Sequence, residues 1–171
     1  YKGVTNESLV RWSLNTYQYD NRKTSGNMAE DFILISPDTG ASHKIQKIAD
    51  SIGYKGDIIT CTKERNTEGK LTKTVVPLNN VDHYEKDYII IDDICDGGRT
   101  FINIAKEIKS NLLDSSKSKI YLIITHGIFS AGFEELSKYF DGIYCTNSYS
   151  EIGDYAGSEK EKTNVKQLNV F

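Results

Sequence analysis

Short apolar runs alternate with helical patterns along this chain, and this alternation limits the fold more than any other feature. The runs are rich in Ile and Tyr and occupy residues 31–36, 57–62, 88–92, 120–125 and 142–147. Apolar runs of this length are typical of strands that are buried on both faces. Strands that alternate with helices favour a parallel sheet. We therefore predict an α/β fold in which a parallel sheet is flanked by helices.

Helical spacing appears in three segments between and before these runs. Apolar residues recur every three or four positions in residues 45–52 and again in residues 101–112, which predicts one helix in each segment. A further helix is predicted for residues 6–18, with Asn6 as its N-cap because a side-chain oxygen there can accept a hydrogen bond from the first turn.

The polar stretch at residues 18–30 predicts a loop, and residues 165–171 predict a last strand. We therefore divide the chain into an N-terminal helix-and-loop extension, residues 1–30, and an α/β domain, residues 31–171.

Composition excludes several classes of protein. The chain has 171 residues, of which 38% are hydrophobic and 26% are charged, as in an ordinary globular domain. The net charge of −3 gives no basic surface for nucleic acid. No apolar run is long enough to span a membrane and no signal peptide opens the chain, so we expect no membrane partner. The three cysteines lie far apart without metal-ligand spacing, which predicts reduced thiols in a cytoplasmic protein.

Three of the predicted strands run directly into polar, turn-forming segments. These segments are residues 37–42, 93–100 and 126–132. In a parallel sheet the carboxyl ends of neighbouring strands lie at the same edge, where ligands bind. The sequence therefore predicts that the three segments meet and form a site.

The segment after the third run has the chemistry of a phosphorylated sugar site. Gly97 and Gly98 let backbone N–H groups approach an anion, Thr100 adds a hydroxyl donor, and a predicted helix begins there. Asp92 and Asp93 would repel a phosphate, but they can accept hydrogen bonds from sugar hydroxyls or hold a divalent cation. The alternative is a capped turn with solvated aspartates, and the combination of features makes it the weaker interpretation.

Residues 89–100, "IIIDDICDGGRT", resemble the ribose-phosphate binding loop of type I phosphoribosyltransferases and their relatives. Two further stretches, residues 35–50 and residues 125–136, resemble segments of the ribose-phosphate diphosphokinase family, which synthesises phosphoribosyl diphosphate. "CTKERN" (61–66) and "YCTNS" (144–148) fall where that family has a basic segment and a Thr-Asn-Thr segment.

The resemblance runs from about Phe32 to Ser148 and matches the C-terminal half of a family whose chain has two similar domains. It implies a Rossmann-like fold of the phosphoribosyltransferase type. It also implies an enzyme that uses Mg²⁺ to transfer diphosphate from ATP to the C1 hydroxyl of ribose 5-phosphate, or of a related 5-phosphorylated ribose such as ADP-ribose. The implied partner is a second copy of the chain or an upstream homologous domain. Because the chain opens with Tyr1 rather than Met, we expect it to be part of a longer protein. The N-terminal half of the resembled family has no counterpart in this chain, so the chain is a fragment or has another use.

The resemblance assigns the sugar phosphate to two groups of residues. Asp92 and Asp93 would bind the ribose hydroxyls. The 5-phosphate would lie in the turn formed by Asp96, Gly97, Gly98, Arg99 and Thr100.

The resemblance assigns the transferred diphosphate to two other segments. It would lie near a loop made by Ser36, Asp38, Thr39 and Gly40, in which Asp38 helps to hold Mg²⁺. Lys63 and Arg65 would be catalytic, because cations stabilise charge on a transferred phosphoryl group. We expect them on a polar loop, residues 63–74, that is poorly ordered without nucleotide and closes over it.

The sequence departs from the family's pattern at a few positions. Glu64 stands between Lys63 and Arg65, where the family often has another basic residue, and Ala41 replaces a glycine of the diphosphate loop. Arg99 adds a cation beside the phosphate turn, which could accommodate a substituent on the 5-phosphate.

Two alternatives stay open: a phosphoribosyltransferase that consumes phosphoribosyl diphosphate, and a catalytically inactive partner domain that binds nucleotide. His126 could act as a base, but we favour a structural role for it. Cys95 is a poor nucleophile candidate, because the neighbouring carboxylates should raise the pKa of its thiol.

Overall fold

Of the chain, the computed structural model describes residues 5–21, 26–69, 71–79, 85–113, 116–154 and 164–170. Its main sheet has six strands in the order β2-β1-β5-β6-β7-β8, and all neighbouring strands are parallel. The strands are β1 (Phe32–Ser36), β2 (Ile58–Thr60), β5 (Asp87–Cys95), β6 (Ile120–Gly127), β7 (Gly142–Thr146) and β8 (Val165–Leu168). The predicted parallel sheet is confirmed, including its last strand near the C-terminus.

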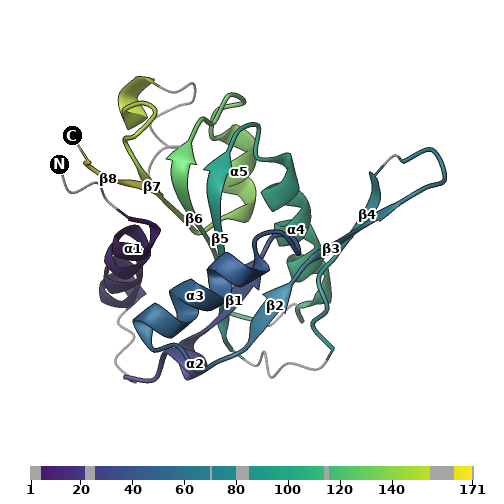
Figure 1. The fold of residues 1–171 in the computed structure, drawn as a ribbon, viewed down its shortest axis with the longest axis horizontal. Coiled ribbons are helices and arrows are strands. Elements are labelled where there is room, and N and C mark those ends of the chain that lie inside the picture. Colours follow the sequence, from purple (N-terminus) through teal and green to yellow (C-terminus); the bar gives the residue numbers. More distant parts are fainter. Residues whose placement is uncertain are drawn as a thin grey trace.

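Helices cover both faces of this sheet (Figure 1). One face carries α1 and α3, and the other carries α4 and α5. The helices are α1 (Asn6–Asn21), α2 (Met28–Asp31), α3 (Ser42–Ile52), α4 (Arg99–Asn111) and α5 (Glu134–Tyr139), with a short 3-10 helix at Ile152–Asp154.

The sheet separates two hydrophobic cores because side chains alternate along each strand. On β5, Tyr88 and Ile90 point into the core beneath α4 and α5. Ile89 and Ile91 point the other way, into the core beneath α1 and α3. This alternation also decides which side chains at the end of β5 reach which face.

Helix α1 begins with a different cap from the predicted one. Thr5 accepts a hydrogen bond at its hydroxyl from the backbone N–H of Ser8 (3.2 Å), and the Ser8 hydroxyl accepts one from the N–H of Thr5 (3.0 Å). This reciprocal pattern is a capping box. The prediction of Asn6 as N-cap is therefore wrong: Asn6 is the first helical residue, and its side chain is free for another contact.

The predicted loop at residues 18–30 is largely wrong. Helix α1 continues to Asn21 and α2 occupies Met28–Asp31, while residues 22–25 lie outside the described part. Tertiary contacts explain the longer helix, because Asp20 pairs with Lys166 on β8 and Asn21 Oδ1 accepts hydrogen bonds from Lys119 (2.8 Å) and from the Tyr121 hydroxyl (2.9 Å). The proposed domain boundary at residue 30 stays a prediction. Helix α1, which precedes this boundary, packs against the sheet of the α/β domain.

Residues 62–65 and 71–75 are the two strands of a hairpin, where a loop was predicted. Strands β3 (Thr62–Arg65) and β4 (Leu71–Val75) pair antiparallel, and the hairpin projects from the sheet beside β2 (Figure 1). Strand β2 accordingly ends at Thr60, earlier than the predicted run to residue 62. Closure of this hairpin over a nucleotide stays a prediction.

Candidate active site

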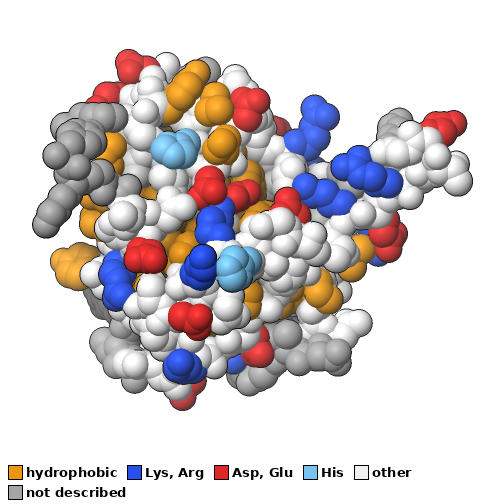
Figure 2. All heavy atoms as spheres, in the orientation of Figure 1, with side chains coloured by type: hydrophobic (Ala, Val, Ile, Leu, Met, Phe, Trp, Pro, Cys, Tyr) orange, Lys and Arg blue, Asp and Glu red, His pale blue; other side chains and the backbone are white. Residues whose placement is uncertain are grey.

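A cavity of about 500 Å³ lies at the carboxyl ends of β1 and β5. All three of the predicted segments contribute to it, so their convergence is confirmed. The lining residues are Asp38, Lys63, Asp92, Ile94, Asp96, Gly97, Gly98, Arg99, Thr100, Phe101 and Ala131. Figure 2 shows acidic and basic side chains close together at the centre of this face, with further basic side chains over the base of the projecting hairpin.

The turn at residues 96–100 leads from β5 into α4 and lines the cavity. Gly98 has φ +74°, and a Cβ there would lie 3.0 Å from the Leu136 side chain, so a larger residue would be strained in the backbone and would have to displace Leu136 slightly. Helix α4 begins at Arg99, which lines the cavity. The unpaired N–H groups of the first helical turn therefore lie at the end of the helix that borders the cavity. No hydrogen bond or ion pair joins the Arg99 guanidinium to the described residues.

The two adjacent aspartates differ in position. Asp92 lines the cavity, as do Ile94 and Asp96, but Asp93 does not. Alternation along β5 explains this difference, because Asp92 shares the face of Ile90 and Asp93 shares the face of Ile91. The structure therefore brings Asp92 to the cavity wall and directs Asp93 toward α1 and α3. Ribose binding by either residue stays a prediction.

Lys44 on α3 holds both carboxylates, and the sequence analysis missed it. Its ammonium lies 3.0 Å from Asp92 Oδ1 and 2.8 Å from Asp93 Oδ2. Burial lowers the pKa of Lys44, but the hydrogen bonds to Asp93 and Asp92 outweigh burial and the net shift is upward, so this lysine stays charged. A lysine three residues into a helix has no distinctive sequence signal, since it resembles an ordinary surface lysine.

Asn6 also reaches the acidic pair and was assigned only a capping role from the sequence. Its Nδ2 donates a hydrogen bond to Asp93 Oδ1 (2.6 Å), and its Oδ1 accepts one from the Thr125 hydroxyl (2.8 Å). Thr125 also lies at the end of β6, and its backbone oxygen accepts a hydrogen bond from the Thr146 hydroxyl (2.6 Å). Asn6 thus connects the ends of β5 and β6, and Thr125 connects them to the end of β7.

The loop predicted for the diphosphate is only partly at the cavity. Asp38 lines it, and Asp38 Oδ1 accepts a hydrogen bond from the N–H of Ala41 (3.0 Å), which fixes the carboxylate at the start of α3. Ser36 is buried and donates from its hydroxyl to the Asp38 backbone oxygen (2.8 Å), so it shapes the loop. Thr39 and Gly40 are exposed and do not line the cavity.

The two predicted catalytic cations are separated. Lys63 lines the cavity, and its Nζ lies 3.8 Å from Asp38 Oδ2. Arg65 is exposed further along the hairpin, where its Nη1 donates a hydrogen bond to the Gly69 backbone oxygen (3.0 Å). The structure therefore brings Lys63 but not Arg65 to the site.

The predicted metal ligand has no ready-made set of protein partners. Among the described residues, no cluster of three or more His, Cys, Asp or Glu side chains is arranged to hold a metal ion. Asp38, Asp92 and Asp96 nonetheless supply oxygen atoms to one cavity. This donor set fits Mg²⁺, which proteins commonly bind through one or two carboxylates together with substrate phosphates.

His126 is exposed rather than buried at the end of β6. Its Nδ1 lies 2.7 Å from the Ser148 hydroxyl, and it does not line the cavity. Next to it, a Cβ on Gly127 would meet the Phe129 ring at 2.1 Å, so only glycine allows this ring to be buried there. The segment that contains His126 and Gly127 therefore shapes the loop in which Ala131 lines the cavity.

The three cysteines are buried. Burial, followed by the charges of Asp96 and Asp92, raises the pKa of Cys95 to about 12, and burial alone is the main reason that the pKa values of Cys61 and Cys145 are also about 12. All three are free. The direction predicted for Cys95 is confirmed, although burial contributes more than the carboxylates.

We expect these thiols to be unreactive in the folded chain. At pH 8 an aromatic disulfide reagent should label them only as fast as the chain unfolds, and all three should react at once in urea. The free energy of unfolding should also fall as the pH rises above about 8.5, because an ordinary thiol then ionises in the unfolded chain. Rapid labelling of one thiol in the folded protein, with the other two silent, would contradict the buried position of that cysteine.

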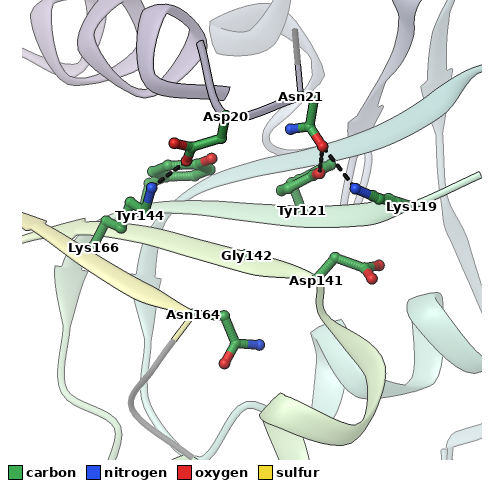
Figure 3. Close-up of a pocket in the computed structure, with 9 residues that line it drawn as sticks. All are labelled: Asp20, Asn21, Lys119, Tyr121, Asp141, Gly142, Tyr144, Asn164 and Lys166. Atoms are coloured by element: carbon green, nitrogen blue, oxygen red, sulfur yellow. Dashed lines mark hydrogen bonds and ion pairs between the residues drawn. The ribbon is translucent and has the colours of Figure 1, made fainter. Parts of the chain in front are cut away.

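A second cavity, of about 250 Å³, lies at the amino ends of strands β6, β7 and β8 (Figure 3). Lys119, Asp141 and Asn164 line it, and each directly precedes one of the strands β6, β7 and β8. Its two lysines already have partners, since Lys119 donates to Asn21 and Lys166 pairs with Asp20. The cavity is therefore separate from the site predicted from the sequence.

The described part of the chain contains no helix that is long and apolar enough to cross a membrane.

Similarity to known proteins is found by sequence and by structure, although no family model matches the chain. Two curated relatives are named ribose-phosphate pyrophosphokinase. The one from Mycoplasmopsis pulmonis is 31% identical over 135 residues, and the one from Pyrococcus furiosus is 32% identical over 117 residues. The alignments cover 78% and 68% of this chain but 39% of each relative. The chain thus spans about two fifths of the length of the curated relatives it matches.

Solved structures show the same fold. Phosphoribosylpyrophosphate synthetase from Mycobacterium smegmatis has a TM-score of 0.65 and 21% identity over 96% of this chain and 46% of that protein. APRTase from Giardia lamblia has a TM-score of 0.54 and 10% identity over 82% of this chain and 77% of that protein. Identities this low establish the fold alone. Over most of its length, this chain is a homologue of the ribose-phosphate pyrophosphokinases, which are enzymes, and it has the phosphoribosyltransferase-type fold.

Proposed function

We propose that this chain forms the sugar-phosphate half of a site that transfers diphosphate from ATP to the C1 hydroxyl of ribose 5-phosphate, with Mg²⁺. One observation carries the proposal: a single cavity gathers the glycine turn, Asp92, Asp38 and Lys63. The names of the curated relatives support the same reaction.

The 5-phosphate would lie in the turn at residues 96–100. Its oxygens would accept hydrogen bonds from the N–H groups at the start of α4 and from the Thr100 hydroxyl, in the field of the helix dipole. The cavity lining supports this placement, because Gly97, Gly98 and Thr100 all contribute to it.

The ribose and the transferred group would lie between this turn and the hairpin. Asp92 would accept hydrogen bonds from the ribose hydroxyls at the cavity wall. Lys63 would stabilise the charge of the transferred diphosphate from the opposite side, where it lies near Asp38. Mg²⁺ held by Asp38 would neutralise phosphate oxygens during the transfer.

The acceptor includes 5-phosphorylated riboses with a larger substituent, such as ADP-ribose. Two features support this wider range. The cavity has a volume of about 500 Å³, and Arg99 lines it without an ion pair to the described residues. A second phosphate attached to the first would therefore find a cation beside the turn.

The remaining part of the ATP site would come from outside this chain. The chain spans about two fifths of its curated relatives, and we propose that an upstream homologous domain or a second copy supplies the rest. Its three buried free thiols support a reducing, cytoplasmic location.

We expect this chain alone to bind phosphorylated ribose but to turn over ATP very slowly. Diphosphoryl transfer needs the donor and the acceptor held in line, and an incomplete donor side loses most of that advantage. A coupled assay should follow AMP release with Mg²⁺ and either ribose 5-phosphate or ADP-ribose, for this chain and for a longer protein that includes the upstream region.

Equal rates from the two proteins would show that the site is complete in this chain. If neither protein released AMP, and diphosphate were instead released from phosphoribosyl diphosphate and a base, the activity would be that of a phosphoribosyltransferase. Ligand binding without either reaction would identify an inactive binding domain.

A further inference from the structure

We infer that Asn6 is a positioning residue for the sugar site and that it acts through Asp93 and Lys44 on Asp92. This inference rests on the proposed function, since it concerns how the same site holds the ribose. It adds a role for helix α1, which lies on the face of the sheet opposite α4 and α5.

The contacts form a continuous chain from α1 to the cavity wall. Asn6 Nδ2 donates to Asp93 Oδ1 (2.6 Å), and Lys44 Nζ lies 2.8 Å from Asp93 Oδ2. The same ammonium lies 3.0 Å from Asp92 Oδ1, which also accepts the N–H of Asp93 (2.8 Å). Both oxygens of Asp93 are therefore engaged by protein groups, while Asp92 Oδ2 has no hydrogen bond to the described residues.

This arrangement gives the two aspartates different tasks. Asp92 lines the cavity and keeps an oxygen available for a ligand. Asp93 lies outside the cavity lining and fixes the direction of the Lys44 ammonium, which in turn fixes Asp92. Two adjacent carboxylates repel each other, so the shared lysine is also what allows both to lie in one geometry.

The Asn6 amide is itself oriented from the other side. The Thr125 hydroxyl donates to Asn6 Oδ1 (2.8 Å), which leaves the NH₂ group directed at Asp93. Thr125 in turn is tied to β7, because its backbone oxygen accepts from the hydroxyls of Thr146 (2.6 Å) and Ser148 (3.2 Å). Asn6 thus transmits the positions of β6 and β7 to the acidic pair on β5.

The test compares two ligands, because Asn6 should affect the ribose and not the phosphate. Calorimetry would measure ribose 5-phosphate and inorganic phosphate binding to the wild type, Asn6→Ala, Asp93→Asn and the double variant. We expect Asn6→Ala to weaken ribose 5-phosphate binding about fivefold and to leave phosphate binding unchanged. The double variant should bind ribose 5-phosphate no more weakly than Asp93→Asn alone, since both changes interrupt one pathway.

Glu7→Ala is the matched control, because Glu7 is exposed in the same helical turn. It should leave both affinities unchanged. The Asn6→Ala protein should fold, since Thr5 and Ser8, and not Asn6, cap the helix. Thermal unfolding would verify this, and Asn6→Asp, which places a third carboxylate beside Asp93, should weaken ribose 5-phosphate binding more than Asn6→Ala.

Four results would overturn the inference. Unchanged ribose 5-phosphate binding in Asn6→Ala would remove Asn6 from the site while leaving the proposed function intact. Equal weakening of both ligands, or additive losses in the double variant, would show that Asn6 has only a general structural role. If the wild type bound neither ligand, the proposed function would fail, and the inference would fail with it.

Discussion

Replacing Lys63 by Ala should lower kcat for AMP release by about a hundredfold, the loss that follows removal of one charge-stabilising group at a reacting centre. Ribose 5-phosphate binding should change by less than about threefold. The reason is that the half-exposed Lys63–Asp38 pair, with its atoms 3.8 Å apart, contributes little to holding the site together. Steady-state kinetics and calorimetry would be run on the protein that includes the upstream region.

Lys73→Ala is a suitable control because Lys73 is an exposed lysine on the other strand of the same hairpin. Its kcat should match that of the wild type. Arg65→Ala should resemble Lys63→Ala only if the hairpin closes during turnover, since Arg65 now lies on the Gly69 carbonyl away from the cavity. Equal losses in kcat and in ribose-phosphate affinity for Lys63→Ala would show that Lys63 only binds substrate.

The second large effect is expected at Asp92. Asp92→Asn should weaken ribose 5-phosphate binding about thirtyfold, because hydrogen bonds to a charged acceptor contribute about 2 kcal/mol each and Asn keeps only one oxygen acceptor. Asp93→Asn should cost less, since Asp93 lies outside the cavity lining. Calorimetry at one ionic strength would give both dissociation constants.

Asp50→Asn removes the same charge from an exposed position on α3 and should bind like the wild type. A loss at Asp93 as large as the loss at Asp92 would mean that the ribose reaches both carboxylates across the strand end. Unchanged binding in the Asp92→Asn/Asp93→Asn double variant would remove the acidic pair from the site.

Local patterns were enough to predict the framework of this site. The apolar runs identified the strands of the sheet, and the polar segments after them predicted which edge carries the cavity, because the direction of a parallel strand fixes where its loop emerges. The glycine turn before α4 could also be predicted, since Gly98 has the positive φ that glycine adopts readily.

The hairpin and α1 show where local patterns were insufficient. Residues 62–75 are polar and lack a hydrophobic alternation. Their sequence therefore did not indicate that β3 and β4 pair as antiparallel strands. Helix α1 extends past the predicted end because Asp20 pairs with Lys166 and Asn21 accepts hydrogen bonds from Lys119 and Tyr121, and these tertiary contacts outweigh the polar sequence at the helix end.

By itself, the sequence determined the parallel fold, the edge that carries the site and the residue types in its glycine turn, because each depends on neighbours within a few positions. Only the tertiary structure decided which of the two aspartates meets the cavity and what holds the other. The contacts of Asp93 with Asn6 and of Asp92 with Lys44 join residues 87 and 48 positions apart. Such partners depend on how α1 and α3 pack against the sheet, and no local pattern contains that information.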